Sequence, residues 1–597
     1  MCGILGQACS QGAINLHTFE QMRDTLAHRG PDDAGLWCSE DKRIALGHRR
    51  LSFLDLSDAG HQPMANEDGA IWIVLNGEVY NYLELREMLV AQGHRFRSRS
   101  DTEVLIHGYE EWGLTGLLGR INGMYAFALW DGKKGELLLA RDHFGIKPLY
   151  YGWVGGQFYF ASELKAILKG LASRPALRLA SVSDYLAYRY VPGPYTIWEG
   201  LYKLPAANYL RLSQREGFGA AQPACYWQLE PASHKTSPGE AAVRVGELLK
   251  NSVSEHLRSD VPVGHFLSGG YDSSALAVYS TALGQRPNAF SIGFEGWARS
   301  EHQYAETVAN HLGIPLYTTI VGAEQLELMD TLAYHYDEPI ADISIIPTYM
   351  VSQLARRHNK AVLSGEGADE IFGGYTWQRE IAHFGRWRAR AAQALQKLSG
   401  GPANYFVERY AEAMAMGRFR SDNLPSMLHP RMQAGIPAFS EWFYASHYRP
   451  GEWPLKAFQY LDVKAFMGEL VLTKIDRASM AHGLEVRVPF LDRTLVEYLF
   501  QLHPSVYFRF GQTKSLLWEN IRHSLPAAIL NRPKQGFVGP DSYYMNLEWY
   551  REHLHNGYLI QDEVISREGL DSLFREKSHW RLWKLIVLEK WWNRWMR

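Results

Sequence analysis

The chain has little cysteine, no excess of charge and no long apolar run. Its four cysteines, in 597 residues, form no C-x-x-C pair and show no metal-ligand spacing, which is typical of a reduced cytoplasmic protein. The net charge of −2 gives no electrostatic signature for nucleic acid or an anionic membrane. No basic segment followed by an apolar one opens the chain, and no apolar run approaches the ~20 residues that span a bilayer. We therefore expect a cytoplasmic protein with neither a nucleic-acid nor a membrane partner.

Length and rhythm predict two domains, because 597 residues exceed what one core organises. Residues 2–212 carry short strands broken by Gly, Asn and Asp. Periodicity stops over 213–239, which predicts a linker. In 240–597, strands alternate with helices and then give way to a mostly helical part, which predicts a parallel sheet with helices on both faces. The Trp-rich stretch 580–597 is expected to be a packed terminal helix rather than a membrane-surface helix.

The second residue is a cysteine. Removal of Met1 would leave Cys2 with a thiol nucleophile and an α-amino base on one residue. Such an amine titrates near about 7.7–8.0, a range suited to taking or relaying a proton. A lone cysteine at position 2 usually has no role, so this interpretation depends on the rest of the site.

Several polar segments supply what a thiol that attacks an amide would need. Arg50 can hold a carboxylate bidentately. Asn76 and the backbone N–H of Gly77 directly follow an apolar strand and would form an oxyanion hole, while Glu78 can hold an ammonium. Asp101 adds a second carboxylate at an expected helix N-terminus, where it could instead serve only as an N-cap. A ligand with a carboxylate, an α-ammonium and a carboxamide fits this set, and glutamine is such a ligand.

A glycine-rich turn, Ser268-Gly-Gly-Tyr-Asp-Ser-Ser274, follows an apolar strand and opens a helix. Its two glycines let backbone N–H groups approach a ligand, and the helix N-terminus favours an anion. Asp272 would repel a phosphate unless a cation lies between them, so Mg²⁺ is implied. The turn contains no G-x-x-x-x-G-K-[ST], which disfavours a Walker-type NTPase and leaves a generic strand-to-helix turn as the alternative.

A second acidic loop follows the apolar strand 361–363, so both loops should meet at the carboxyl edge of the sheet. In this loop Asp369 can share the Mg²⁺, and Glu366 is a candidate proton acceptor. Segments further along the chain bring basic groups, of which Lys534 could neutralise a leaving pyrophosphate.

Taken together, these motifs resemble two known domains. The first half resembles the class II glutamine amidotransferase domain of the N-terminal nucleophile type, through Cys2-Gly-Ile, His28-Arg-Gly-Pro-Asp32, Arg50-Leu-Ser, Asn76-Gly-Glu-Val-Tyr-Asn81, Ser100-Asp-Thr-Glu103 and Arg141-Asp-His-Phe-Gly-Ile-Lys-Pro-Leu-Tyr150. The second half resembles the ATP-pyrophosphatase synthetase domain of the glutamine-hydrolysing asparagine synthetases. The resemblance implies an α+β αββα sandwich followed by an α/β parallel-sheet domain with a largely helical C-terminal part. A homodimer is an expectation from the resemblance alone.

The resemblance also implies a reaction. Cys2 forms a glutamyl thioester and releases ammonia, with Asn76 and Gly77 as oxyanion donors and Arg50, Asn76, Glu78 and Asp101 holding glutamine. ATP adenylates the β-carboxylate of aspartate, pyrophosphate leaves, and ammonia that has crossed a tunnel attacks the acyl-adenylate. Glu366 would deprotonate the ammonia or its adduct, and Lys534 would stabilise the adenylation transition state. The implied ATP site comprises Leu267, Ser268, Gly269, Gly270, Asp272, Ser273, Ser274, Ile292, Ser364 and Gly365, with Asp272 and Asp369 as Mg²⁺ ligands.

The sequence leaves the acceptor open. Tyr271 replaces a commonly aliphatic residue, and Ile343 and Ile345 stand where small or polar residues are usual, which fits either a larger, less polar substrate than aspartate or a repacked helix start. The candidate acceptor-binding residues are Tyr271, Ile343, Lys474, Arg477 and Arg487. Relatives of this architecture amidate uronic acids on nucleotide sugars or natural-product carboxylates, whereas those that close β-lactams lack the N-terminal cysteine. A non-enzymatic scaffold is disfavoured because Cys2, Asp272, Glu366, Asp369 and Lys534 are all present.

Overall fold

The computed structural model describes residues 2–232, 234–297, 300–378, 405–450, 452–508, 512–532, 536 and 539–597. The candidate Lys534 lies outside these residues.

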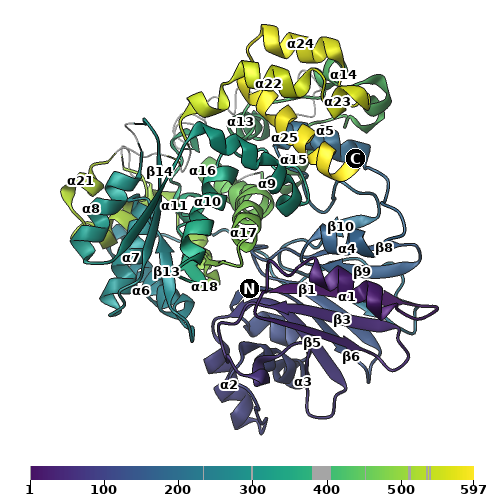
Figure 1. The fold of residues 1–597 in the computed structure, drawn as a ribbon. Coiled ribbons are helices and arrows are strands. Elements are labelled where there is room, and N and C mark those ends of the chain that lie inside the picture. The colour runs from purple at the N-terminus through teal and green to yellow at the C-terminus, as the bar shows by residue number, and fades with distance from the viewer. Residues whose placement is uncertain are drawn as a thin grey trace.

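Two six-stranded antiparallel sheets form the N-terminal domain (Figure 1). The first has the strand order β10-β8-β9-β1-β3-β2 and the second β12-β11-β7-β6-β5-β4. The strands are β1 (Gly3–Cys9), β2 (Asp33–Cys38), β3 (Ile44–Arg50), β4 (Met64–Ala65), β5 (Ile71–Val79), β6 (Gly123–Asp131), β7 (Glu136–Arg141), β8 (Tyr150–Val154), β9 (Gln157–Ala161), β10 (Leu201–Lys203), β11 (Asn208–Ser213) and β12 (Ala224–Cys225).

The two sheets stack face to face, with helices outside. Ile4 and Leu46 of the first sheet pack against Ala126 and Leu139 of the second. Helices α1 (Leu16–Asp24) and α4 (Leu164–Gly170) pack on the first sheet, and α2 (Tyr82–Ala91) and α3 (Asp101–Arg120) belong to the layer of the second. Because each sheet is covered on both faces, strands such as β1 are buried along their whole length. This is the αββα sandwich expected from the sequence.

The segment predicted as a linker contributes to both domains. Within it, β12 pairs with β11 at the edge of the second sheet. Near its end, Ser237 and Glu240 form a capping box that starts α6 (Pro238–His256).

The C-terminal part contains a five-stranded parallel sheet of order β15-β14-β13-β16-β17. Its strands are β13 (Val263–Phe266), β14 (Ala289–Phe294), β15 (Leu316–Val321), β16 (Ala361–Leu363) and β17 (Glu485–Arg487). The associated helices are α7 (Tyr271–Ala282), α8 (His302–Leu312), α9 (Met329–Tyr336), α10 (Ile345–Arg356) and α11 (Ala368–Phe372). Since β13 pairs directly with β16, the turns that follow them meet at one edge of the sheet, as predicted.

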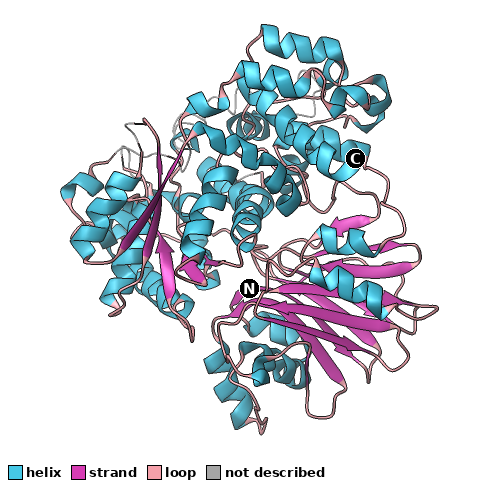
Figure 2. Cartoon of the chain, viewed as in Figure 1, coloured by secondary structure: helices cyan, strands magenta, loops and turns pink. Residues whose placement is uncertain are grey.

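The described residues beyond this sheet are mostly helical (Figure 2). The helices are α13 (Tyr405–Met414), α14 (Leu424–Met427), α15 (Trp442–His447), α16 (Pro454–Leu461), a π-helical stretch (Asp462–Val471), α17 (Leu472–Met480), α18 (Arg493–Gln501), α19 (Pro504–Tyr507), α20 (Ser515–Ile521), α21 (Ala527–Leu530), α22 (Leu547–Leu554), α23 (Tyr558–Gln561), α24 (Arg567–Arg575) and α25 (His579–Met596). Two of them, α15 and α25, bond directly to α5 (Leu179–Tyr188) of the N-terminal segment. Helix α25 buries Trp583, Trp591 and Trp592, so this helix is packed, as expected. None of the described helices is long and apolar enough to cross a membrane.

Candidate active sites

Cys2 precedes β1 and is buried where the two sheets of the sandwich meet. Its backbone N–H donates to Asn76 Oδ1 at 2.9 Å, and its carbonyl accepts from Arg29 Nε at 3.0 Å. Burial raises the pKa of the Cys2 thiol, an effect opposed by the backbone N–H of Leu51 and the charge of Arg50. Leu51 and Arg50 therefore offset part of the cost that burial imposes on the Cys2 thiolate.

Asn76 lies on β5 with no exposed surface, and its Nδ2 has no hydrogen-bond partner within the described chain. A buried N–H without a partner is costly unless a ligand accepts from it. The neighbouring Gly77 has φ 148°, and a side chain there would come within 2.0 Å of the Met124 carbonyl oxygen. The fold therefore requires glycine at this position and leaves the Asn76 amide with an unused donor beside Cys2, which is the arrangement an oxyanion requires.

Two buried carboxylates, Glu78 and Asp101, lie close to each other next to Asn76. Burial raises the pKa of Asp101 to about 6. Burial and the charge of Asp101 raise the pKa of Glu78 well above its usual range. A ligand ammonium between them would compensate both costs.

Arg50 is buried at the end of β3. Its guanidinium donates to the carbonyl oxygens of Leu54 at 3.1 Å, Asp55 at 2.6 Å and Ser57 at 3.3 Å. These bonds fix the guanidinium in place before any ligand binds.

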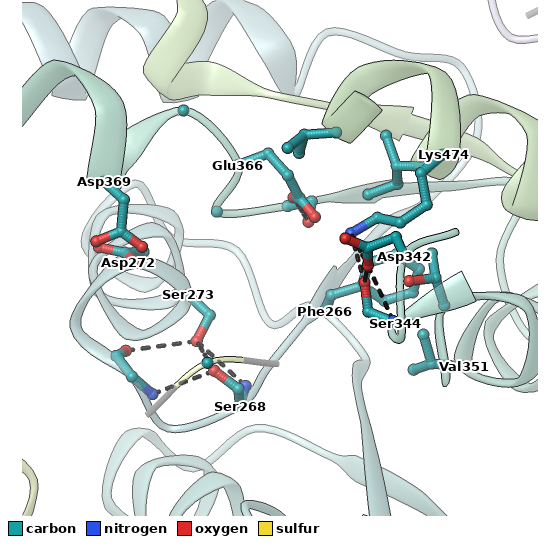
Figure 3. A pocket seen from close by; sticks show the side chains of 18 of the residues that line it. Phe266, Ser268, Asp272, Ser273, Asp342, Ser344, Val351, Glu366, Asp369 and Lys474 are labelled. Atoms are coloured by element: carbon teal, nitrogen blue, oxygen red, sulfur yellow. Dashed lines mark hydrogen bonds and ion pairs between the residues drawn. The ribbon is translucent and has the colours of Figure 1, made fainter. Parts of the chain in front are cut away.

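A second site occupies a cavity of about 400 Å³ at the carboxyl edge of the parallel sheet (Figure 3). The candidates from the sequence that line it are Leu267, Ser268, Gly270, Asp272, Ser273, Ile343, Ser364, Gly365, Glu366, Asp369 and Lys474. Gly269, Ser274 and Ile292 lie outside this lining set. Gly269 instead gives the turn its φ of +71°, with the Tyr304 backbone 2.5 Å from where a Cβ would be.

The turn after β13 is organised by its own hydroxyls. Ser273 Oγ accepts from the Ser268 backbone N–H at 3.1 Å, and Ser268 Oγ accepts from Gly270 N–H at 3.3 Å. These bonds fix the backbone of the strand-to-helix turn where it lines the cavity, as a phosphate-binding turn requires.

Lys514 lies between the two carboxylates predicted to bind metal. Its Nζ is 2.6 Å from Asp272 Oδ1 and 2.7 Å from Asp369 Oδ1, and its side chain is 5% exposed. These two charges hold the pKa of Lys514 above its usual range. An ammonium therefore stands where Mg²⁺ was expected, and two facing carboxylates with a cation between them fit a divalent ion.

The other end of the cavity carries three charges. Asp342 lies between Arg189 (Nη1 to Oδ2, 3.5 Å) and Lys474 (Nζ to Oδ1, 3.8 Å). Lys474 also donates to Ser344 Oγ at 2.7 Å. In Figure 3, Glu366 stands between this group and the Asp272–Asp369 pair. Sequence reasoning missed Lys514, Arg189 and Asp342. Only Asp342 had a sequence signal, since it directly precedes Ile343, which the sequence analysis had singled out.

Three candidates for acceptor binding do not line the cavity. Tyr271 points away and donates its hydroxyl to the Leu530 carbonyl. Arg477 faces Glu163 at 2.8 Å and Asp337 at 3.5 Å. Both make these contacts outside the cavity and are not among the residues that line it.

Arg487 also lies elsewhere, at the contact between the domains. It donates to Glu485 at 2.6 Å and to the carbonyls of His256 and Arg258, and its Nη2 is 3.8 Å from Glu78 Oε1. Its own carbonyl accepts from the backbone N–H of Ser364 at 2.9 Å. Arg487 therefore contacts the first site with its side chain and the second with its backbone.

Buried ion pairs join the two domains, and one of their members, Arg29, also bonds the Cys2 carbonyl. Arg29 bonds Asp476 at 2.8 and 3.1 Å and Glu163 at 2.8 Å. Lys165 pairs with Asp337 at 2.9 Å. All four of these contacts are between side chains that are at most 2% exposed. Buried charges of this kind require their partners, so they specify how the domains dock.

Comparison with known proteins agrees with this geometry. A family model described as "Glutamine amidotransferase domain" matches residues 1–227, and one described as "Asparagine synthase" matches residues 244–594. The chain is 31% identical to asparagine synthetase [glutamine-hydrolyzing] 1 of Bacillus subtilis, over 99% of this chain and 97% of that one. It is 29% identical to amidase chry2 of Gibberella zeae, over 88% of this chain and 85% of that one. These matches define a protein built from a glutamine amidotransferase domain and a synthase domain. The chain belongs to the asparagine synthase family.

Proposed function

We propose that this protein is a glutamine-dependent amide ligase that converts aspartate to asparagine with release of AMP and pyrophosphate. In this proposal residues 2–212 release ammonia and residues 240–597 activate the acceptor carboxylate. Arg189 belongs to residues 2–212 but acts in the second site. The observation that carries the proposal is the arrangement of one cavity. In it Glu366 lies between the Asp272–Asp369 pair and the group formed by Asp342, Arg189 and Lys474 (Figure 3).

Release of ammonia takes place at Cys2. The thiolate attacks the carboxamide carbon of glutamine, and the oxyanion accepts from Asn76 Nδ2 and from the Gly77 N–H. Collapse of the tetrahedral adduct breaks the C–N bond, ammonia leaves with the proton taken from the thiol, and water then hydrolyses the thioester to glutamate. The Glu78–Asp101 pair holds the substrate ammonium, and Arg50 holds its carboxylate.

Activation of the acceptor takes place at the sheet edge. The turn from Ser268 to Ser273 would cradle the ATP phosphates, and Asp272 and Asp369 would hold Mg²⁺, which neutralises phosphate charge when bound. Lys514 would then turn from these carboxylates toward the phosphates and stabilise the charge that develops on pyrophosphate.

Formation of the amide requires ammonia without its extra proton. Glu366, which lines the cavity, would take a proton from the attacking ammonia or its adduct. Apolar side chains from both domains, Phe144 and Ile146 from one and Met467 and Ile475 from the other, belong to one continuous cluster. A passage through this cluster would favour neutral ammonia over ammonium.

Aspartate suits the charges at the far end of the cavity. Its α-ammonium would face Asp342, and its α-carboxylate would face Arg189 and Lys474, leaving the β-carboxylate for adenylation. A second candidate is a larger carboxylic acid, because Ile343, Met416 and Phe466 also line the cavity.

Product analysis separates the two. With glutamine, ATP, Mg²⁺ and aspartate we expect asparagine, AMP and pyrophosphate in equal amounts. Asp342→Asn should raise the KM for aspartate by about 10-fold or more and leave the KM for ATP unchanged. Asp330→Asn, at an exposed aspartate paired with Lys590, is the matched control. No AMP with aspartate, but turnover with a uronic acid or another carboxylate, would replace aspartate by the second candidate.

A further inference from the structure

Two histidines and a glutamate meet in the helical layer of the second sheet, outside both candidate active sites. His107 and Glu110 are one turn apart on α3, and His94 lies on the segment that joins α2 to α3. His107 Nδ1 is 3.1 Å from His94 Nδ1 and 3.2 Å from Glu110 Oε2, and His94 Nδ1 is 4.0 Å from that same oxygen. Three ligand atoms of the kinds that zinc prefers therefore face one point.

The spacing of these atoms suits a metal ion without rearrangement. A triangle with edges of 3.1, 3.2 and 4.0 Å has a point about 2.0 Å from all three corners, which is the usual length of a zinc bond to histidine nitrogen or carboxylate oxygen. Three protein ligands would leave a fourth position for water. The side chains of His94 and Glu110 are 17% and 25% exposed, so an ion can reach the point from solvent.

The outward nitrogens of both imidazoles face carboxylates. His94 Nε2 is 3.2 Å from Glu111 Oε2, and His107 Nε2 is 3.7 Å from Glu103 Oε1. With protons on both Nε2 atoms, the Nδ1 lone pairs point at each other across 3.1 Å, and they repel unless a proton or a metal cation lies between them. Carboxylates that orient metal-binding histidines in this way are characteristic of metal sites.

The remaining groups are also fixed. Asn66 Nδ2 donates to Glu110 Oε1 at 2.8 Å, which leaves Oε2 for the shared point. Glu103 accepts from the backbone N–H groups of Arg97 and Ser98, each at 2.8 Å. Glu110 and the carboxylate behind His107 are thus each fixed by further groups of the same domain.

We propose that His94, His107 and Glu110 bind one divalent transition-metal ion, with Zn²⁺ as the best match to two imidazoles and a carboxylate. The ion would fasten the segment between α2 and α3 to α3. That segment also supports the glutamine site, since Arg99 N–H donates to Asp55 Oδ2 at 2.7 Å and Asp101 begins α3. Binding to the folded state alone would stabilise the N-terminal domain.

The test uses Co²⁺ as a spectroscopic probe of the full-length protein. We expect one equivalent of Co²⁺ to give the visible absorption of a four-coordinate site and Zn²⁺ to displace it. His94→Ala and Glu110→Gln should each weaken this binding by about 10–100-fold or abolish it. His17→Ala, at an exposed histidine on α1 that bonds Gln21, is the matched control.

Comparison among the variants isolates this site, because Cys2 and the acidic pair of the second cavity are present in all of them. Zn²⁺ should raise the Tm of the wild type and of His17→Ala but not that of His94→Ala. All variants should retain glutamine hydrolysis, which shows that they fold. Equal Co²⁺ titrations in the wild type and His94→Ala would overturn the proposal and leave a proton as the occupant of the point between the imidazoles.

Discussion

Replacement of Asn76 tests the proposed oxyanion hole most directly. Its Nδ2 is fully buried and unpaired in the described structure, so its hydrogen bond to a developing oxyanion would form in a site from which water is excluded. Loss of one such donor typically costs about 2.7–4 kcal/mol, or 10²–10³ in kcat. We expect Asn76→Ala to lower the kcat of glutamine hydrolysis by this factor and to change the KM for glutamine little, because the bond strengthens only as charge develops.

A second substitution separates the donor from the acceptor of the same side chain. Asn76 Oδ1 accepts from the Cys2 N–H, and Asn76→Asp keeps that acceptor while it removes the Nδ2 donor. Its loss of kcat should equal or exceed that of Asn76→Ala, since a carboxylate repels an oxyanion.

The assay measures glutamate release and, separately, ammonia-dependent amide synthesis, which should remain at the wild-type rate. Asn208→Ala, in the same sheet with its Nδ2 donating to Ala206 O, is the matched control. A loss of less than about 10-fold in the hydrolysis kcat would refute the assigned role, as would an equal loss in both activities.

Three further predictions concern other parts of the two sites. Cys2→Ala should abolish glutamine hydrolysis but leave ammonia-dependent synthesis, and loss of both would contradict separate sites. Lys514→Met should lower AMP formation by about 10²–10³ without affecting glutamine hydrolysis. Mg²⁺ alone should raise the Tm of this variant more than that of the wild type, because two facing carboxylates have lost their cation; equal shifts would argue against this metal site. Burial raises the pKa of Asp101 to about 6, so this carboxylate gains a proton as the pH falls through 6 and loses its attraction for the ammonium of glutamine. The KM for glutamine should therefore rise below pH about 6 in the wild type and stay high and flat in Asp101→Asn, whereas a flat wild-type profile would exclude Asp101 from binding.

The cavity at the carboxyl edge of the parallel sheet shows what local sequence signals can predict. Asp272 and Asp369 each follow a short apolar strand and a glycine turn, and the pairing of β13 with β16 brings them to one edge. The apolar strands and the glycine turns are local signals, and in a parallel sheet the turns that follow the strands lie at one edge, so this part was predictable. Arg189 reaches the cavity, and Lys514 reaches the Asp272–Asp369 pair that lines it, from distant segments of the chain. Each adopts a positive φ, of 76° and 52°, which the residue type does not predict.

The basic residues of the candidate acceptor site show what local sequence signals do not predict. Arg477 and Arg487 were expected at the acceptor because a cation is needed there, yet both are fully buried against carboxylates at the domain contact. Lys474, on the same helix as Arg477, does line the cavity. Residue type alone does not distinguish a cation that faces a ligand from one that pairs with a buried carboxylate. On α17 the difference depends on which face of the helix each residue occupies.

The dual contact of Arg487 has a consequence for dissecting the protein. An excised N-terminal domain would keep Cys2 and Asn76 but lose Arg487, whose guanidinium stands 3.8 Å from Glu78. Glu78 would keep Asp101, a second buried acid, beside it without that guanidinium, and its affinity for an ammonium would no longer be that of the intact chain. Glutamine kinetics measured on such a fragment would describe a different pocket, so the two halves have to be compared through point substitutions in one continuous polypeptide.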